Sequence, residues 1–176
     1  MKKTITTISI VLLTTISANE FSLGKLNTGQ TVSYTDYDDG YYQIGKKREY
    51  TRDDEKNIVT DLATGLMWQD DSDVGSIEKN WEDAKTYCSG LTLGGYSDWY
   101  LPSIEELVSI TDKGRDNPAI NPIFQNVDTG SYYWSSTTNA NYTDVAWSVV
   151  FKFGGINYYC GKKNSRYVRC LRFDGQ

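Results

Sequence analysis

The spacing of apolar residues predicts a helix between residues 80 and 91. Four apolar positions in this stretch recur at the interval that places side chains on one helix face: Trp81, Ala84, Cys88 and Leu91. Asn80 is a favourable N-cap, and Gly90 suits the C-terminal end of a helix. The pattern therefore predicts an amphipathic helix that turns Cys88 toward the core.

A second helix is predicted directly after Pro102. Ser103 and Glu106 have the spacing of a capping box. Three apolar residues form the buried face of this helix: Ile104, Leu107 and Val108. The residues before it, GGYSDWYLP, are typical of a glycine turn followed by a short aromatic strand.

Strand patterns dominate the rest of the sequence. Residues 57–70 predict a β-hairpin with ATG as its turn and with Leu66 and Trp68 on one face. Four later segments also predict strands: YYWSST, VAWSVVFKF, INYYC and RYVRCLRF. In the second of these, four side chains alternate onto one face: Trp147, Val149, Phe151 and Phe153. Two helices followed by an antiparallel sheet indicate an α+β domain.

The N-terminal 18 residues have the pattern of a secretory signal peptide. Two lysines precede an apolar, threonine-rich run, and Ala18 ends a small-residue cleavage site. The run is too short to remain in a membrane, so we expect export to the periplasm, the outer surface or the medium without stable membrane insertion. Residues 19–56 are polar and tyrosine-rich, and we expect them to form an N-terminal extension that packs on a domain spanning residues 57–173.

Export permits a disulfide, and the chain has three cysteines with which to form one. A bridge between Cys160 and Cys170 would close a local hairpin. A bridge between Cys88 and Cys170 would join the first predicted helix to the last predicted strand. The spacing of the cysteines leaves both pairings open.

Charge and composition narrow the range of functions. The 176 residues include 18 Lys and Arg against 23 Asp and Glu, which gives a formal net charge of −5. This acidic balance argues against a nucleic-acid partner. The basic residues gather at positions 46–48 and 162–172. The chain has no histidine, which excludes Ser–His–Asp and Cys–His nucleophilic sites and His-ligated zinc.

Two acidic stretches could suggest calcium. A calcium loop that starts at Asp36 would need Asp or Asn, Gly and Glu at its fifth, sixth and twelfth positions, but the chain has Gly40, Tyr41 and Lys47 there. We expect a solvated acidic loop at the second stretch: Asp70, Asp71 and Asp73. The sequence therefore predicts no cofactor, and no motif supports calcium.

Seven motifs in order resemble the Lcl C-terminal domain family, long filed as a domain of unknown function: TDLATGLMWQD, WEDAKTYC, GGYSDWYLPSIEEL, NPAINPIF, YYWSSTT, AWSVVFKFGG and YVRCLR. The resemblance implies a C-type-lectin-like fold with two helices, a small antiparallel sheet and long irregular loops. It also implies a Cys88–Cys170 disulfide, with Cys160 outside the pattern. We expect structural roles for all five tryptophans: Trp68, Trp81, Trp99, Trp134 and Trp147.

The resemblance implies binding, in particular adhesion to sulfated polysaccharides or to host and biofilm surfaces. True C-type lectins bridge sugars through calcium with Glu-Pro-Asn or Gln-Pro-Asp in a loop and Trp-Asn-Asp on a strand. This chain has DNPAINP and YTDVAWS instead, so we do not expect calcium-bridged sugar recognition.

We therefore expect an exported, non-catalytic module that binds a polysaccharide or another cell-surface polymer. The candidate ligand-binding residues lie in the loop NANYTD and in the last hairpin: Tyr142, Asp144, Tyr158, Tyr159, Lys162, Lys163 and Arg166. Tyrosine rings can stack on sugars, and Lys and Arg can bind sulfate or carboxylate. One alternative is an envelope domain that is structural or binds a surface protein. A lesser one is a formylglycine-generating-type oxidase, whose reactive cysteine pair a bridged Cys88 would not supply.

Overall fold

The computed structural model describes residues 25–174 of the chain. The signal peptide expected at residues 1–18 lies outside the described residues. Between residues 25 and 174, no helix is long and apolar enough to cross a membrane. The elements in chain order are α1 (Asp39–Tyr42), β1 (Tyr50–Asp53), β2 (Ile58–Asp61), β3 (Leu66–Gln69), the 3-10 helix η1 (Ser72–Gly75), β4 (Glu78–Lys79), α2 (Trp81–Gly90), α3 (Ile104–Ser109), β5 (Tyr132–Thr138), β6 (Val145–Val150), β7 (Gly155–Gly161), β8 (Arg166–Tyr167) and β9 (Leu171–Phe173).

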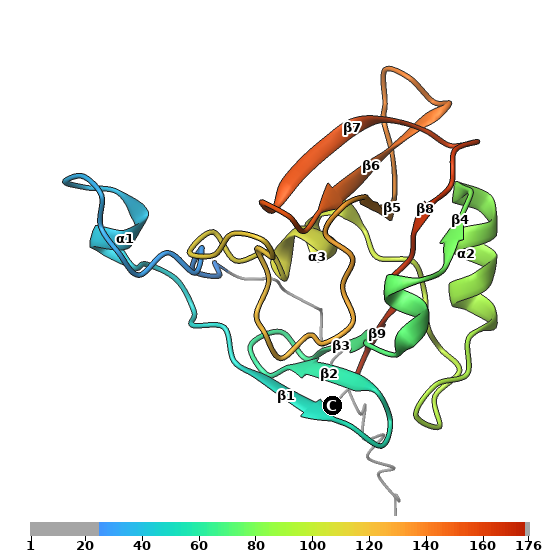
Figure 1. Ribbon diagram of the computed structural model, residues 1–176, viewed down its shortest axis with the longest axis horizontal. Coiled ribbons are helices and arrows are strands. Elements are labelled where there is room, and N and C mark those ends of the chain that lie inside the picture. The colour runs from blue at the N-terminus through green and yellow to red at the C-terminus, as the bar shows by residue number, and fades with distance from the viewer. Residues whose placement is uncertain (1–24, 175–176) are drawn as a thin grey trace, which may run out of the picture.

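The strands form two small sheets, and α3 lies between β2–β3 and β5–β7 in the view of Figure 1. One sheet has the order β1-β2-β3-β9 and is antiparallel throughout. The other has the order β4-β8-β5-β6-β7, in which only the short β5–β8 contact is parallel. The predicted α+β class is therefore confirmed, while the C-type-lectin-like assignment stays a prediction.

The last segment of the chain is divided between the two sheets. β8 pairs with β4 and β5, whereas β9 pairs with β3, so the expectation of one continuous strand from RYVRCLRF is wrong. The chain passes from one sheet to the other at Cys170, whose backbone hydrogen-bonds to Gln69 instead of continuing the pairing of β8. The Cys170 N–H donates to Gln69 Oε1 at 3.0 Å, and the Gln69 N–H donates to the Cys170 carbonyl at 3.0 Å. The aromatic strand expected before Pro102 is likewise reduced to one bridge, between Tyr100 and Leu171.

Both predicted helices begin where their capping residues indicated. The Asn80 side chain accepts a hydrogen bond from the Asp83 N–H at 3.0 Å at the start of α2. At the start of α3, Ser103 Oγ accepts from the Glu106 N–H at 3.2 Å, and Glu106 Oε2 accepts from the Ser103 N–H at 2.7 Å. These bonds satisfy N–H groups that have no partner within the helix, so local sequence sets both start points.

The core consists of two hydrophobic clusters. The first lies around α3 and the four-stranded sheet, and the second gathers the inner face of α2 with β5 and β6. Four tryptophans are buried in these clusters: Trp68, Trp81, Trp99 and Trp134. Trp147 differs because it is only partly buried, at the margin of the first cluster. Phe153 is 59% exposed because β6 ends at Val150 and the chain turns there, so the predicted alternation does not extend to it.

The Cys88–Cys170 disulfide is present and joins α2 to the residue before β9. The bridge confirms the pairing that the family resemblance implied. Cys160 is a buried free cysteine whose sulfur lies 3.0 Å from Ser148 Oγ. Both bridged cysteines are inaccessible to solvent, which is typical of a structural disulfide rather than a redox-active one.

The acidic stretch after β3 is not the solvated loop that its composition suggested. Asp70 is fully buried and pairs with two arginines, Arg52 and Arg169, the latter at 2.9 Å. Its carboxylate also accepts from the backbone N–H groups of Gln125 and Asn126, at 2.8 and 3.3 Å. A buried carboxylate needs such partners because isolated charge is costly in the interior. Asp70 therefore anchors the loop before β5 to the end of β3.

The N-terminal extension forms an arm that carries α1 away from the body (Figure 1). Asp38 caps α1 by accepting from the Tyr41 N–H at 2.8 Å, which gives the acidic turn a structural role. The arm contacts the body where the Lys113 N–H donates to the Thr28 carbonyl at 2.8 Å. Its last part continues into β1, so the extension supplies a strand to the four-stranded sheet.

Candidate binding surface

Four aromatic side chains form a continuous surface on β6, β7 and the loop between β5 and β6. We call the set Tyr142, Trp147, Tyr158 and Tyr159 the hairpin aromatic surface. Ring centroids are 5.5 Å apart for Trp147 and Tyr158, 4.6 Å for Tyr158 and Tyr159, and 5.6 Å for Tyr142 and Tyr159. The three tyrosines are about half exposed, between 48% and 58%. Such a row of exposed rings on one protein is a feature of ligand and partner sites.

Irregular strand pairing produces this surface. In the β6–β7 ladder, Ala146 faces Cys160 and Ser148 faces Asn157, so Tyr158 and Tyr159 both lie opposite Trp147. This is a β-bulge, which lets two consecutive side chains of β7 remain accessible where a regular strand would turn one inward. The neighbouring β5–β6 ladder is also irregular at Trp147. Ser135 in that stretch donates from Oγ to the Trp147 carbonyl at 2.7 Å and so fixes its backbone.

The Tyr159 hydroxyl interacts with a neighbouring phenol of the surface. Hydrogen bonding with Tyr142 raises the pKa of Tyr159 above its ordinary value, so the phenol stays protonated. A protonated phenol can both donate and accept. The surface therefore combines apolar ring faces with hydroxyl groups. A sugar ring likewise has apolar C–H faces and hydroxyl groups at its edge.

An apolar groove of about 370 Å³ adjoins the surface at Trp147. Its walls come from three elements of the fold, α3, β5 and the β6–β7 hairpin: Ile104, Glu105, Val108, Thr137, Trp147 and Ile156. Ile156 is 50% exposed although it lies in a strand. The groove extends the apolar area of the hairpin aromatic surface toward α3.

The predicted cations differ in how they are engaged. Lys162 Nζ donates to Thr138 Oγ1 at 2.8 Å and lies 3.9 Å from the centroid of a Trp81 ring. Arg166 donates to the Ser165 carbonyl and lies over Tyr132 at 5.9 Å. Lys163 and Asp144 are exposed. The structure thus brings the three predicted tyrosines together, whereas Lys162 and Arg166 are held mainly by neighbours within the protein.

Sequence reasoning missed Trp147 and Ile156 as surface residues. Both occupy strand positions whose apolar character predicts burial. Trp147 lies at strand bulges, which leave no clear pattern in the sequence, whereas Ile156 pairs regularly with Val149 on the outer strand β7. It also missed a small polar pocket between the arm and the body, in which the basic stretch at residues 46–48 supplies two of the lining residues.

The chain matches the Lcl C-terminal domain over residues 57–172. Because this match covers most of the chain, the protein belongs to the Lcl C-terminal domain family. The search of curated proteins finds no match. The matched range starts just before β2 and ends within β9, so it contains the hairpin aromatic surface, the groove and the disulfide.

Proposed function

We propose that the protein is an exported, non-catalytic module that binds polysaccharide through the hairpin aromatic surface. The observation that carries the proposal is the row of stacked, half-exposed rings at Tyr142, Tyr158 and Tyr159, backed by Trp147. Export is supported by the signal pattern of the sequence and by the Cys88–Cys170 disulfide, because disulfides persist in oxidising compartments.

Ring faces and hydroxyls would share the recognition of a polymer. The C–H faces of sugars pack on aromatic rings, and the phenol hydroxyls meet sugar hydroxyls at the ring edge. Several rings in a row suit consecutive sugar units, so weak contacts along one chain would add to a useful avidity. Lys163, which follows β7, is an exposed cation that could meet a sulfate or carboxylate substituent.

The double variant Tyr158→Ala, Tyr159→Ala should weaken polysaccharide binding by about tenfold or more, because it removes two adjacent stacking faces. Binding would be measured on a glycan array and by affinity electrophoresis, with neutral and sulfated polymers and with or without calcium. The matched control is Tyr37→Ala, Tyr41→Ala, which removes two exposed tyrosines of the arm whose centroids lie 5.6 Å apart.

Equal binding by both double variants would contradict the assignment of the surface. Binding that falls equally for neutral and sulfated polymers supports recognition by stacking. If only sulfated polymers bind, and moderate salt abolishes the binding, the cations rather than the rings carry the affinity.

A second candidate function is protein binding in the envelope, and the apolar groove favours it. Ile156 and Trp147 line the groove beside β7, which is the outer strand of its sheet. Outer strands offer backbone groups for pairing with an extended partner segment. Recovery of one protein from envelope extracts, lost in Ile156→Asp and kept in the double tyrosine variant, would support this function over polysaccharide binding.

A further inference from the structure

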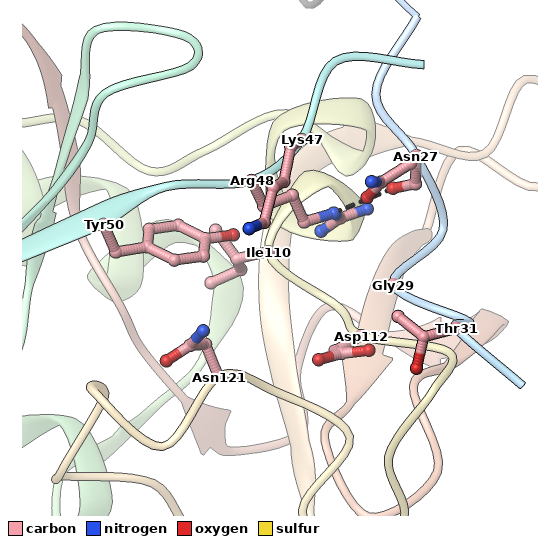
Figure 2. A pocket seen from close by; sticks show the side chains of 9 residues that line it. All are labelled: Asn27, Gly29, Thr31, Lys47, Arg48, Tyr50, Ile110, Asp112 and Asn121. Carbon is pink, nitrogen blue, oxygen red and sulfur yellow. Dashed lines mark hydrogen bonds between the residues drawn. The ribbon is translucent and has the colours of Figure 1, made fainter. Parts of the chain in front are cut away.

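A polar pocket lies at the junction between the arm and the body (Figure 2). The arm and the segment leading into β1 supply most of its residues, and the stretch after α3 supplies the rest: Asn27, Gly29, Thr31, Lys47, Arg48, Tyr50, Ile110, Asp112 and Asn121. Its volume is about 130 Å³. The pocket is separate from the hairpin aromatic surface and shares no residue with it.

One wall of the pocket is cationic. Arg48 is fixed by two backbone carbonyls, since Nε donates to Asn27 at 3.0 Å and Nη1 donates to Ser109. Its remaining terminal nitrogen, Nη2, donates to no backbone carbonyl or carboxylate within residues 25–174. Lys47 lies next to it, and neither side chain forms an ion pair with a residue that the structure describes. This wall therefore presents two positive charges to the pocket.

The hydroxyl of Tyr50 points toward this cationic wall (Figure 2). It is buried, and although Arg48 interacts with its oxygen, its proton has no acceptor among the described residues. The ring is held edge-on against Phe124 with centroids 5.4 Å apart, so the hydroxyl has a fixed direction. Burial raises the pKa of Tyr50 to about 12, which keeps the proton on the oxygen. A buried donor without a partner is uncommon in native proteins and calls for an acceptor.

The facing wall carries a carboxylate and an amide. Asp112 Oδ1 accepts from the Gly114 N–H at 2.9 Å, and Asn121 Oδ1 accepts from the Ile123 N–H at 3.0 Å. These bonds orient both side chains and leave Asp112 Oδ2 and the Asn121 NH₂ group without partners among the described residues. The arm packs tightly here, because a Cβ at Gly29 would lie 2.1 Å from Asp112 Oδ1 at a φ of +88°.

We propose that this pocket binds a small zwitterion of the amino-acid type, with its carboxylate at Lys47, Arg48 and Tyr50 and its ammonium group at Asp112. A simple anion would leave the Asp112 carboxylate without a partner, and a simple cation would be repelled by the two basic side chains. A ligand with both charges pairs its carboxylate with the cationic wall and the phenol proton, and its ammonium group with Asp112. The size agrees, since a cavity of about 150 Å³ accommodates a molecule with six non-hydrogen atoms such as benzene.

The pocket lies between the arm and the body, so a bound ligand would affect how firmly the arm is held. Lys47 and Arg48 precede β1, whereas Asp112 and Asn121 belong to the stretch after α3. A ligand that contacts both walls would therefore stabilise, by mass action, the docked position of the arm that the structure shows. Hydrogen exchange of residues 25–49 should slow when the pocket is filled.

The test titrates the full mature chain with L-alanine, lactate and L-alaninamide, followed by NMR chemical shifts. Lactate lacks the ammonium group and alaninamide lacks the carboxylate. We expect L-alanine to bind with a Kd below about 1 mM and each analogue to bind at least about tenfold more weakly. Tyr50→Phe, which keeps the ring on Phe124, should weaken alanine binding by about tenfold. Asp112→Asn should weaken alanine binding without weakening lactate binding, because it removes a negative charge that attracts the ammonium group and disfavours an anion.

The control variant is Tyr142→Phe, which removes a phenol on the hairpin and should leave alanine binding unchanged. The proposal is overturned if alanine causes no saturable shift at about 10 mM, if lactate binds as well as alanine, or if both pocket variants bind alanine like the wild type. These outcomes are independent of polysaccharide binding, because no residue is common to the two sites. Nε-acetyl-lysine carries the same α-ammonium and α-carboxylate groups as alanine on a longer side chain. If it binds more weakly than alanine, the pocket fits a small amino acid, and if it binds more tightly, the pocket fits a larger zwitterion.

Discussion

Replacing Asp70 with asparagine should lower the free energy of unfolding by about 3–5 kcal/mol, the usual cost of breaking a buried ion pair. Asp70 and Arg169 are both fully buried, so the change would leave Arg169 charged and without its carboxylate. The loop at Gln125 and Asn126 would also lose one of the two oxygens that accept from its backbone N–H groups, because asparagine replaces one oxygen with an NH₂ donor. Urea denaturation followed by tryptophan fluorescence measures the change.

Asp54→Asn provides the matched control for this prediction. Asp54 pairs with Arg52, as Asp70 does, but its side chain is 78% exposed. An exposed pair contributes only about 0–1 kcal/mol, so this variant should unfold close to the wild type. A similar small loss in both variants would show that Asp70 is not the electrostatic anchor described above.

The double variant Cys88→Ala, Cys170→Ala should melt roughly 10 °C below the wild type. The bridge closes a loop of 82 residues, and the chain-entropy model assigns such a loop about 4 kcal/mol of stabilisation. For a domain of this size each kcal/mol shifts the Tm by about 2–4 °C. Differential scanning calorimetry measures the Tm, and mass spectrometry after thiol alkylation verifies the loss of the bridge.

Cys160→Ala separates the effect of the disulfide from that of removing any buried thiol. Cys160 is free and buried, so this variant keeps the bridge and loses only local packing against Ser148. Its Tm should fall by clearly less than that of the double variant. Equal decreases would mean that the bridge adds little beyond the volume of its sulfur atoms.

Both predictions concern the same short segment, residues 168–170, at which the chain passes from one sheet to the other. Arg169 is held by Asp70, and Cys170 is held by Cys88 and by the side chain and backbone of Gln69. These contacts come from α2 and from the end of β3. The segment therefore joins the two halves of the core, and its anchors are expected to dominate the stability of the domain.

Several features of the fold could be predicted because they depend on neighbours in the sequence. The start points of α2 and α3 follow from Asn80 and from the Ser103–Glu106 capping box. The hairpin of β2 and β3 follows from two apolar segments around a glycine turn, and Gly65 there has a φ of +76°. The disulfide was implied by the family resemblance, since the cysteine spacing itself left two pairings open.

Other features could not be predicted because they depend on residues far apart in the chain. Asp70 follows a strand and is succeeded by two more acidic residues, a pattern typical of a solvated loop. Its burial depends on Arg169, which lies 99 residues later. The division of the last segment into β8 and β9 depends in the same way on Gln69, 101 residues before Cys170.

The sequence by itself determined the α+β class, the helix start points and the family, because capping groups, apolar spacing and ordered motifs act over short distances. Only the tertiary structure decided which residues form a surface. Tyr158 and Tyr159 are accessible together because a bulge places both opposite Trp147, and strand register is set by packing across the sheet. The polar pocket likewise exists only because the arm folds back onto the stretch after α3, which brings the charges of Lys47, Arg48 and Asp112 around one cavity.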